Sequence, residues 1–511
     1  IREQPRSRGL GDVYKRQPYA NTLATDGSTR FNDSGLVKVY LWDSTAFKYN
    51  LLNTIKPPTD TSSSNESMNF GWAHKICEPG ASSVRSTPTK YLFVSAPGHN
   101  SNEGVVYMYE WSIGADGSTY DTWTNCLTLE SADVGTGKKF GQHLEANDNG
   151  DILAVHSVSS GQAGKVEIYR RTSQSSDDSV QHAFTLVQTL TGISADGSTL
   201  NRGFGSSLAM SKDGTTLIVG APGADSGDQA DAGAIYYYKW DADGDSTLSY
   251  TLQQTIYAPD TQTNMKFGSS IDINDAGTRL VIGAEKFSNS RDMNFDSGAT
   301  TFDLQDTRIV DLNVGSGGAY TATMYNTQFV IDDRLVTTSV SPNDDFGRGV
   351  CVIDQTVFVG APDDDGNTAT DGSSKIENDG TMTVFDLTKD NTYSWKEIAT
   401  ESPLINNERI GSAFIFDSTS NKIIDYLDYY DPVKGRLLGI ADREINIKTT
   451  WDPAVYNFGP NANTKTPWGE EHIGEVWWDL SKVKWTWYEQ GDQEFKTNNW
   501  GKIFPLSLIH I

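Results

Sequence analysis

The sequence predicts an all-β protein built from repeated four-stranded sheets. Glycine accounts for 47 of the 511 residues, and Asp, Ser, Thr and Asn are frequent between short apolar runs. This texture is typical of many short strands joined by tight turns. A second observation is an internal repeat, because Phe-Gly recurs every 60 to 80 residues and a similar phrase follows each time. The five copies begin at Phe70, Phe140, Phe204, Phe267 and Phe346.

The copy that begins at Phe204 shows how one repeat is organised. Apolar residues alternate directly after Phe-Gly, and Asp213-Gly214 then supplies residues that accept the positive φ of a tight hairpin. A continuous apolar run follows, which indicates a strand buried on both faces, and it ends at Ala221-Pro222 because proline cannot donate to a ladder. The expected strands are residues 208–210, 217–220, 234–238 and 250–256.

Four-stranded sheets repeated at this period are the blades of a β-propeller. Residues 35–55 match the end of a blade whose start is lost, so five blades and part of a sixth are visible. We expect about six or seven blades in the full protein, with one or more truncated here. Ile410-Gly411 could open one more blade or begin the next domain. The Phe of each Phe-Gly is expected to fill the gap between blades, and the small residues of the Gly-Ala-Pro phrase fit a crowded centre.

The phrases FGSSLAMSKDGTTLIVGAP, from Phe204, and FGRGVCVIDQTVFVGAP, from Phe346, resemble the FG-GAP repeat. This repeat occurs in integrin α-subunit heads and in many bacterial and phage surface proteins, and the resemblance covers residues 25 to about 400. It implies a propeller with a ligand face at one rim. Integrin-like repeats often hold calcium in an Asp-x-Asp-x-Asp-Gly turn between strands one and two. The turns here read KDG, NDAG and NDNG, too short and too poor in acids, so no cofactor is carried over.

Long polar loops follow strand two in each repeat and are expected to project from one rim. Loops on a rigid scaffold are the usual place for binding, although tolerated insertions would look the same. The loops are residues 97–104, 156–164, 221–233, 284–298 and 361–380. The candidate binding residues in them are Asp225, Asp228, Asp231, Asp363, Asp364 and Asp365.

Two acidic stretches could hold a cation, because calcium prefers several converging oxygen ligands. Asp363, Asp365 and Asn367 form the stronger candidate, and the DADGDS stretch at 241–246 is the weaker one. The alternative is a turn in which Asp and Asn side chains bond their own backbone.

The composition argues against several classes of function. A formal net charge of −26 repels phosphate backbones, so no nucleic-acid partner is expected. No apolar run is long enough to cross a bilayer, so no membrane insertion is expected. The seven histidines are scattered, and no nucleophile, zinc or phosphate-loop motif accompanies them, which predicts a protein that is not an enzyme.

The predicted organisation has four parts. Residues 1–17, with five Arg or Lys and two acids, and residues 506–511 resemble sequencing-adapter read-through and are expected to be non-native. Residues 18–405 form the propeller. Residues 406–505, which hold seven of the 13 tryptophans, are expected to form a small Trp-rich β module.

The phrases LDYYDP and VWWD in the C-terminal part resemble a recurring region in virion structural proteins of T-even-like marine tailed phages. The resemblance implies a non-catalytic virion or tail component whose propeller loops bind virion or tail proteins, or a host-surface glycan or protein. One alternative is a bacterial secreted or cell-surface adhesin. Another is a polysaccharide-active propeller enzyme, which would need two or three converging carboxylates.

Overall fold

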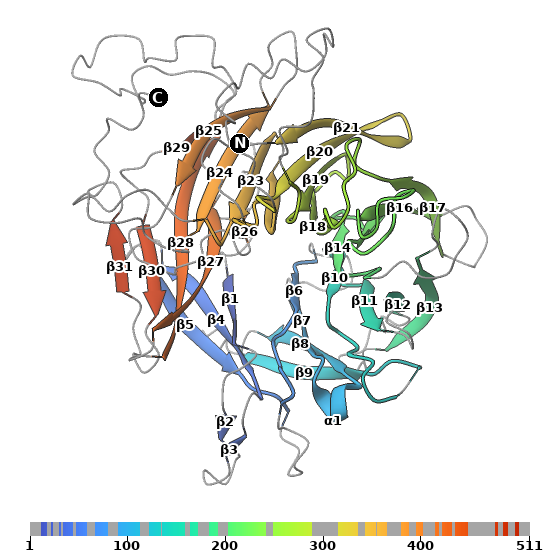
Figure 1. Cartoon of the computed structure of the whole chain (residues 1–511). Coiled ribbons are helices and arrows are strands. Elements are labelled where there is room, and N and C mark those ends of the chain that lie inside the picture. Colours follow the sequence, from blue (N-terminus) through green and yellow to red (C-terminus); the bar gives the residue numbers. More distant parts are fainter. Residues whose placement is uncertain are drawn as a thin grey trace, which may run out of the picture. The chain divides into compact units, whose positions relative to one another are not determined.

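The structure, a computed structural model, is all-β apart from one four-residue helix, α1 (His99–Asn102), in the part of the chain that it describes (Figure 1). No helix in this part is long and apolar enough to cross a membrane. The described residues are 12–17, 22–23, 30–31, 34–43, 48–58, 67–79, 90–112, 122–133, 135–158, 164–171, 183–192, 203–241, 249–288, 315–335, 343–353, 355–364, 380–387, 395–401, 414–417, 422–431, 435–447, 476–478, 484–488 and 496–499.

The chain divides into two compact units. The first unit comprises Asp12–Ser288 with Tyr320–Ile331, and the second comprises Ile1–Gly11, Asn289–Ala319 and Asp332–Ile511.

The first unit holds a series of antiparallel sheets in chain order. Its three-stranded sheet consists of β1 (Asp12–Gln17), β4 (Leu36–Asp43) and β5 (Lys48–Ile55), and β2 (Thr22–Leu23) pairs with β3 (Arg30–Phe31). Three four-stranded sheets follow: β6 (His74–Cys77), β7 (Tyr91–Ala96), β8 (Val105–Ser112) and β9 (Thr122–Leu129); β10 (Leu144–Ala146), β11 (Ile152–Val158), β12 (Gly164–Arg171) and β13 (Phe184–Thr191); β14 (Ser207–Met210), β15 (Thr216–Ala221), β16 (Ala234–Asp241) and β17 (Ser249–Ile256).

A further sheet is formed by β18 (Phe267–Ile273), β19 (Arg279–Ala284), β20 (Gly318–Tyr325) and β21 (Gln328–Leu335). Each strand predicted for the repeat at Phe204 overlaps one of β14 to β17, and β15 ends at Ala221 as expected. The prediction of propeller-type, four-stranded blades is therefore confirmed, and the blade number of the full protein stays a prediction. Strand β1 lies in the segment predicted to be non-native and pairs with β4.

The apolar core lies between neighbouring blades. Ile218 and Ile235 from the β14–β17 blade share one buried cluster with Leu280 and Ile282 from the β18–β21 blade. Similar clusters join β10–β13 to β14–β17, and β6–β9 to β10–β13. Burial of each such side chain contributes about 1.5–3 kcal/mol, so the blades stabilise one another face to face.

The Phe of each Phe-Gly is at most 1% exposed. Within the first unit, the side chains of Phe70, Phe140, Phe204 and Phe267 sit between blades, as predicted. Phe267 illustrates the arrangement, since it makes a parallel bridge to Gly233 at the start of the preceding blade's third strand. Gly233 has φ of +90°, and a Cβ there would lie 2.1 Å from the carbonyl oxygen of Phe267. Only glycine therefore allows this close approach of the two backbones.

Glutamine side chains join the outer strands of consecutive blades. The Gln188 amide donates to the Tyr250 carbonyl at 2.9 Å and accepts the Tyr250 N–H at 2.7 Å. Gln254 makes the same pair of bonds with Phe329, both at 2.9 Å. The amide thereby satisfies backbone groups that an outer strand leaves unpaired. Leu127 occupies the corresponding position, next to the same β-bulge, in the β6–β9 blade.

Replacing Gln188 by Leu, the residue of the β6–β9 blade, should lower the free energy of unfolding by about 1–2 kcal/mol. The change leaves the backbone N–H and C=O of Tyr250 without these bonds while it keeps the side chain's bulk. Chemical denaturation would measure the effect. Gln253→Leu is the matched control, since Gln253 is exposed and bonds only within its own strand, and it should change stability by less than about 0.5 kcal/mol. Equal effects of the two variants would contradict the assignment.

The second unit contains one four-stranded blade and one larger sheet. The blade consists of β22 (Gly349–Ile353), β23 (Thr356–Ala361), β24 (Thr381–Leu387) and β25 (Trp395–Glu401). The larger sheet has the order β26 (Phe414–Asp417), β27 (Lys422–Asp431), β28 (Gly435–Ile447), β30 (Lys484–Tyr488) and β31 (Lys496–Asn499), and β29 (Val476–Trp478) also pairs with β28. A separate Trp-rich module stays a prediction.

Candidate functional site

The repeat provides an internal reference, and the β10–β13 blade departs from it by carrying ionisable side chains at buried positions. In β14–β17 and β22–β25 the second strand ends in Gly-Ala-Pro, and in β6–β9 it ends in Ser-Ala-Pro. In every case the Gly of Phe-Gly donates its N–H to the residue that opens this phrase. In the β10–β13 blade that residue is His156, followed by Ser157, because the Gly141 N–H donates to the His156 carbonyl at 3.0 Å.

The third strand of the same blade also departs from the reference. Strand registers align Glu167 with Tyr107 and Tyr236, which pack against the Phe of their own Phe-Gly at centroid distances of 5.7 and 5.2 Å. The same registers align Lys165 with Val105 and Ala234. Ionisable side chains thus replace an aromatic and an aliphatic residue in one blade.

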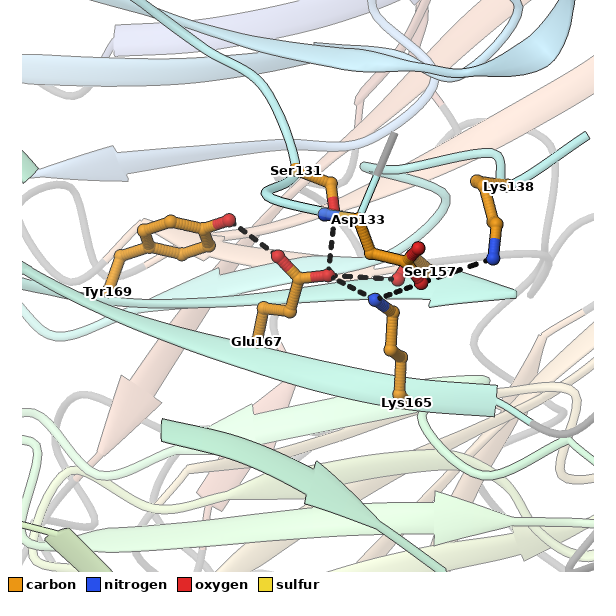
Figure 2. Close-up of polar contacts among 7 residues, drawn as sticks. All are labelled: Ser131, Asp133, Lys138, Ser157, Lys165, Glu167 and Tyr169. Atoms are coloured by element: carbon orange, nitrogen blue, oxygen red, sulfur yellow. Dashed lines mark hydrogen bonds and ion pairs between the residues drawn. The ribbon is translucent and has the colours of Figure 1, made fainter. Parts of the chain in front are cut away.

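Glu167 is the centre of a buried polar cluster (Figure 2). Glu167 is 1% exposed. One of its carboxylate oxygens accepts a hydrogen bond from the Ser131 hydroxyl at 2.7 Å and pairs with the Lys165 ammonium at 2.8 Å. The Ser157 hydroxyl approaches the same oxygen at 3.4 Å, and the Tyr169 hydroxyl donates to the other at 2.5 Å. Buried charges require such partners, and this carboxylate has four.

The cluster reaches the surface at Asp133. Lys165 and Lys138 both donate to the same oxygen of Asp133, at 3.0 and 3.1 Å. The Asp133 side chain is 52% exposed, whereas the Lys165 side chain is 10% exposed. The chain between β9 and β10 carries Ser131, Asp133 and Lys138, so the cluster fastens this interblade segment to strand β12 (Figure 2).

The pKa shifts follow from these contacts. Hydrogen bonds from Lys165 and Lys138 hold the pKa of Asp133 below its usual value. Burial lowers the pKa of Lys165, but its bonds to Glu167 and Asp133 outweigh burial and raise the pKa overall. Burial and the hydrogen bond to Glu167 both raise the pKa of Tyr169. The Lys165 ammonium and the Asp133 carboxylate are therefore charged at neutral pH.

The cluster holds its side chains in fixed positions and is poorly suited to proton transfer to a ligand. Glu167 is 1% exposed and both of its oxygens accept hydrogen bonds within the cluster, so the carboxylate does not reach a ligand at the surface. The two carboxylates and two ammonium groups balance to zero net charge. The solvent-exposed part of the cluster is a charge-balanced polar surface. It lies at the base of the loop at 156–164, which the sequence predicts to project from the rim.

Three of the residues predicted for binding lie in the loop between β15 and β16. Asp225 accepts the backbone N–H of Asp231 at 2.8 Å, and Asp231 pairs with Lys266 at 3.0 Å. Asp225 and Asp228 are exposed, and Asp231 is half-buried. The structure therefore brings Asp225 and Asp231 together as a loop brace, and their roles in binding stay predictions.

The acidic run after β23 is described only at its start. Asp363 is half-buried, and Asp364 is 1% exposed and accepts the Thr381 hydroxyl at 2.7 Å. Asp364 thus points into the blade. Asp365 and Asn367, predicted with Asp363 as a calcium site, lie outside the described residues, as does most of the DADGDS stretch. Within the described part of the chain, no three His, Cys, Asp or Glu side chains converge as metal ligands.

Sequence analysis missed the Glu167 cluster and the histidine at 156. A signal for both was present, because the repeat from Phe140 reads LAVHS where the repeat from Phe204 reads LIVGA, and GKVEIY where the latter reads GAIYYY. The contribution of Ser131 and Asp133 could not be read in this way, since their segment has no counterpart in the repeated phrase.

The FG-GAP repeat family model matches residues 185–238, which run from β13 through most of β16. No curated protein matches the chain.

Among solved structures, a candidate 6-phosphogluconolactonase from Bacteroides uniformis is similar at 8% identity, with a TM-score of 0.47, over 85% of this chain and 93% of that chain. A candidate 6-phosphogluconolactonase from Bacteroides fragilis has 9% identity and a TM-score of 0.48, over 86% and 93%. The periplasmic gluconolactonase PpgL of Pseudomonas aeruginosa has 12% identity and a TM-score of 0.47, over 85% and 93%. At these values no activity or substrate is carried over to this chain.

Proposed function

We propose that this protein is a non-catalytic binding protein, and that the rim of the β10–β13 blade is its principal contact surface. The observation that carries the proposal is the concentration of ionisable and polar replacements at one rim of the β10–β13 blade. His156, Ser157, Lys165 and Glu167 replace small or apolar residues that a propeller scaffold alone would accept. Such replacements cost folding free energy unless each polar group is satisfied, which favours a role beyond the scaffold.

The surrounding rim is a firm platform for contact. The Lys139 N–H donates to the Asn102 carbonyl at 2.8 Å, so the segment before Phe140 is tied to the loop of the preceding blade. The Phe267 N–H makes the same kind of bond to Ala232 at 2.9 Å. Loops braced in this way present side chains at fixed positions, which lowers the entropy lost on binding.

The chemistry of the surface favours an uncharged polar ligand. Asp133 and Lys138 offer one acceptor and one donor group at the rim, and the four charges of the cluster cancel. The formal net charge of −26 opposes polyanions. A host-surface glycan has the matching hydroxyl groups, and we infer that a glycan is the ligand class. The proposal that this protein is a virion or tail component rests only on the LDYYDP and VWWD phrases of its C-terminal part.

A printed glycan array tests this proposal. We expect the wild-type protein to bind at least one glycan, and Asp133→Asn with Lys138→Gln to weaken that binding about tenfold, since a buried hydrogen bond to a charged group contributes about 1.5–3 kcal/mol. The matched control is Lys212→Gln with Asp275→Asn. These two residues form an exposed ion pair at 3.4 Å. They lie in the turns between the first and second strands of two blades, at the ends of the strands opposite to the proposed rim. Weakening by the control variant, with no effect of the rim variant, would contradict the proposal.

A further inference from the structure

The β10–β13 blade carries a cross-strand pair of histidines at its rim. The His156 N–H donates to the His143 carbonyl at 2.8 Å, and the two rings lie 5.5 Å apart, tilted by 58°. The corresponding pairs are Ala73 and Ser95 in β6–β9, and Ser207 and Gly220 in β14–β17. Two imidazoles therefore occupy positions where the other blades of this unit place small side chains.

His156 fills space that glycine leaves open on both sides. A Cβ on Gly164, at the start of β12, would lie 2.9 Å from Nε2 of His156, and a Cβ on Gly205 would lie 2.5 Å from its Cδ2. Gly205 belongs to the Phe-Gly of the following blade, so the ring sits at the contact between two blades. His156 is 4% exposed, and its Nδ1 has no hydrogen-bond partner among the described residues.

The charged groups around His156 offer no local compensation for a proton. From the segment before β10, His143 is the titratable group that acts on His156, and the 203–206 segment of the next blade contains none. On β12, the neighbour of His156 in register is Val166, and its flanking residues Lys165 and Glu167 pair with each other. Across the rim, Lys138 and Asp133 also pair with each other.

We propose that protonation of the His143–His156 pair is an acid-sensitive release that loosens the rim of this blade below about pH 6. A second proton places two positive charges on adjacent rings, in a contact where the described residues supply no unpaired carboxylate. The chain can relieve this only by separating the His156 ring from Gly205 and admitting water. The segments that then open are the interblade segment before β10 and the ends of β11 and β12.

The sign of the pH dependence follows from burial. Burial, and secondarily the neighbouring His143, lower the pKa of His156 to about 3, whereas an unfolded histidine titrates near about 6.5. The contribution of neutral His156 to stability is therefore complete above about pH 6.5 and is lost progressively as the pH falls towards 3. Local opening at the rim should precede global unfolding, because opening only this contact exposes the ring.

Hydrogen exchange measured by mass spectrometry on the full chain tests this proposal. After correction for intrinsic rates, peptides covering 136–146 and 152–168 should exchange at least about fivefold faster at pH 5.5 than at pH 7.5. Peptides covering 203–222 and 230–241 are internal controls from the next blade and should keep their protection. Absence of acid-dependent exchange in the first two peptides would overturn the proposal.

Two variants, with residues taken from the β6–β9 blade, separate titration from packing. His156→Ser should give the same protection at both pH values in all four peptides. His143→Ala retains the buried imidazole but removes its neighbour, so the loss of protection should move to lower pH. An acid-dependent loss that is unchanged in both variants would overturn the proposal. The readout uses free protein, so it is independent of whether the rim binds a glycan.

Discussion

Gly233→Ala is expected to separate the β14–β17 and β18–β21 blades and to cost about 4 kcal/mol or more of unfolding free energy. A Cβ at this position would lie 2.1 Å from the Phe267 carbonyl oxygen and 2.4 Å from its nitrogen, and neither backbone atom can move without disturbing the next blade. The φ of +90° adds strain of its own. Since Phe267 is fully buried, displacing it also opens the core between the blades.

Gly227→Ala is the matched control, because it isolates backbone strain. Gly227 has φ of +58°, in the same loop, and no atom lies within 4 Å of a Cβ built on it. This variant should cost only about 1 kcal/mol. Urea denaturation with limited proteolysis would compare the two. Similar losses in both variants would show that the close approach of Gly233 to Phe267 is unimportant.

Glu167→Tyr is expected to lower the unfolding free energy by about 3 kcal/mol. The change introduces the residue that the neighbouring blades carry, yet it leaves the Lys165 ammonium with only the half-exposed Asp133 as its partner. It also removes the acceptor for the buried hydroxyls of Ser131 and Tyr169. Chemical denaturation at pH 7 would measure the loss.

The double variant Lys165→Val with Glu167→Tyr re-creates the Val105 and Tyr107 pair of the β6–β9 blade. Replacing both members of a buried ion pair by well-packed apolar residues is often neutral or stabilising. We therefore expect the double variant to recover about 1–2 kcal/mol, the part of the loss that comes from the unpaired Lys165 ammonium, because the Ser131 and Tyr169 hydroxyls still lack their acceptor. If the double variant is as unstable as Glu167→Tyr, the cost lies in packing and in those lost hydrogen bonds, and not in the broken ion pair.

Much of the blade structure could be predicted from sequence because its signals are local. The apolar run at 217–220 and the Asp213-Gly214 turn specify two paired strands within 20 residues of each other. The role of Phe267 also followed, since a large apolar residue at a fixed repeat position must be buried somewhere between repeats. The Gly233 contact was less accessible, because it depends on a residue in the preceding repeat that approaches only after the blades pack.

The candidate site was less predictable than the scaffold. The residues proposed from sequence were acids in exposed loops, and the structure uses Asp225 and Asp364 to brace those loops. Glu167 stood out less because a glutamate on a strand usually faces solvent. Its burial depends on Ser131 and Lys165, which converge on it only in the folded blade. Comparing the repeats with one another, position by position, would have revealed it.

We propose that ligands bind at the rim carried by the β10–β13 blade. Hydrogen exchange in the presence and absence of a glycan selected from the array would locate the bound surface. We predict that the bound glycan slows exchange in peptides covering 131–143 and 156–166 and leaves the strand-one-to-strand-two turns at 147–150, 211–214 and 274–277 unchanged. Protection of those turns, with none at 131–143 and 156–166, would contradict binding at this rim.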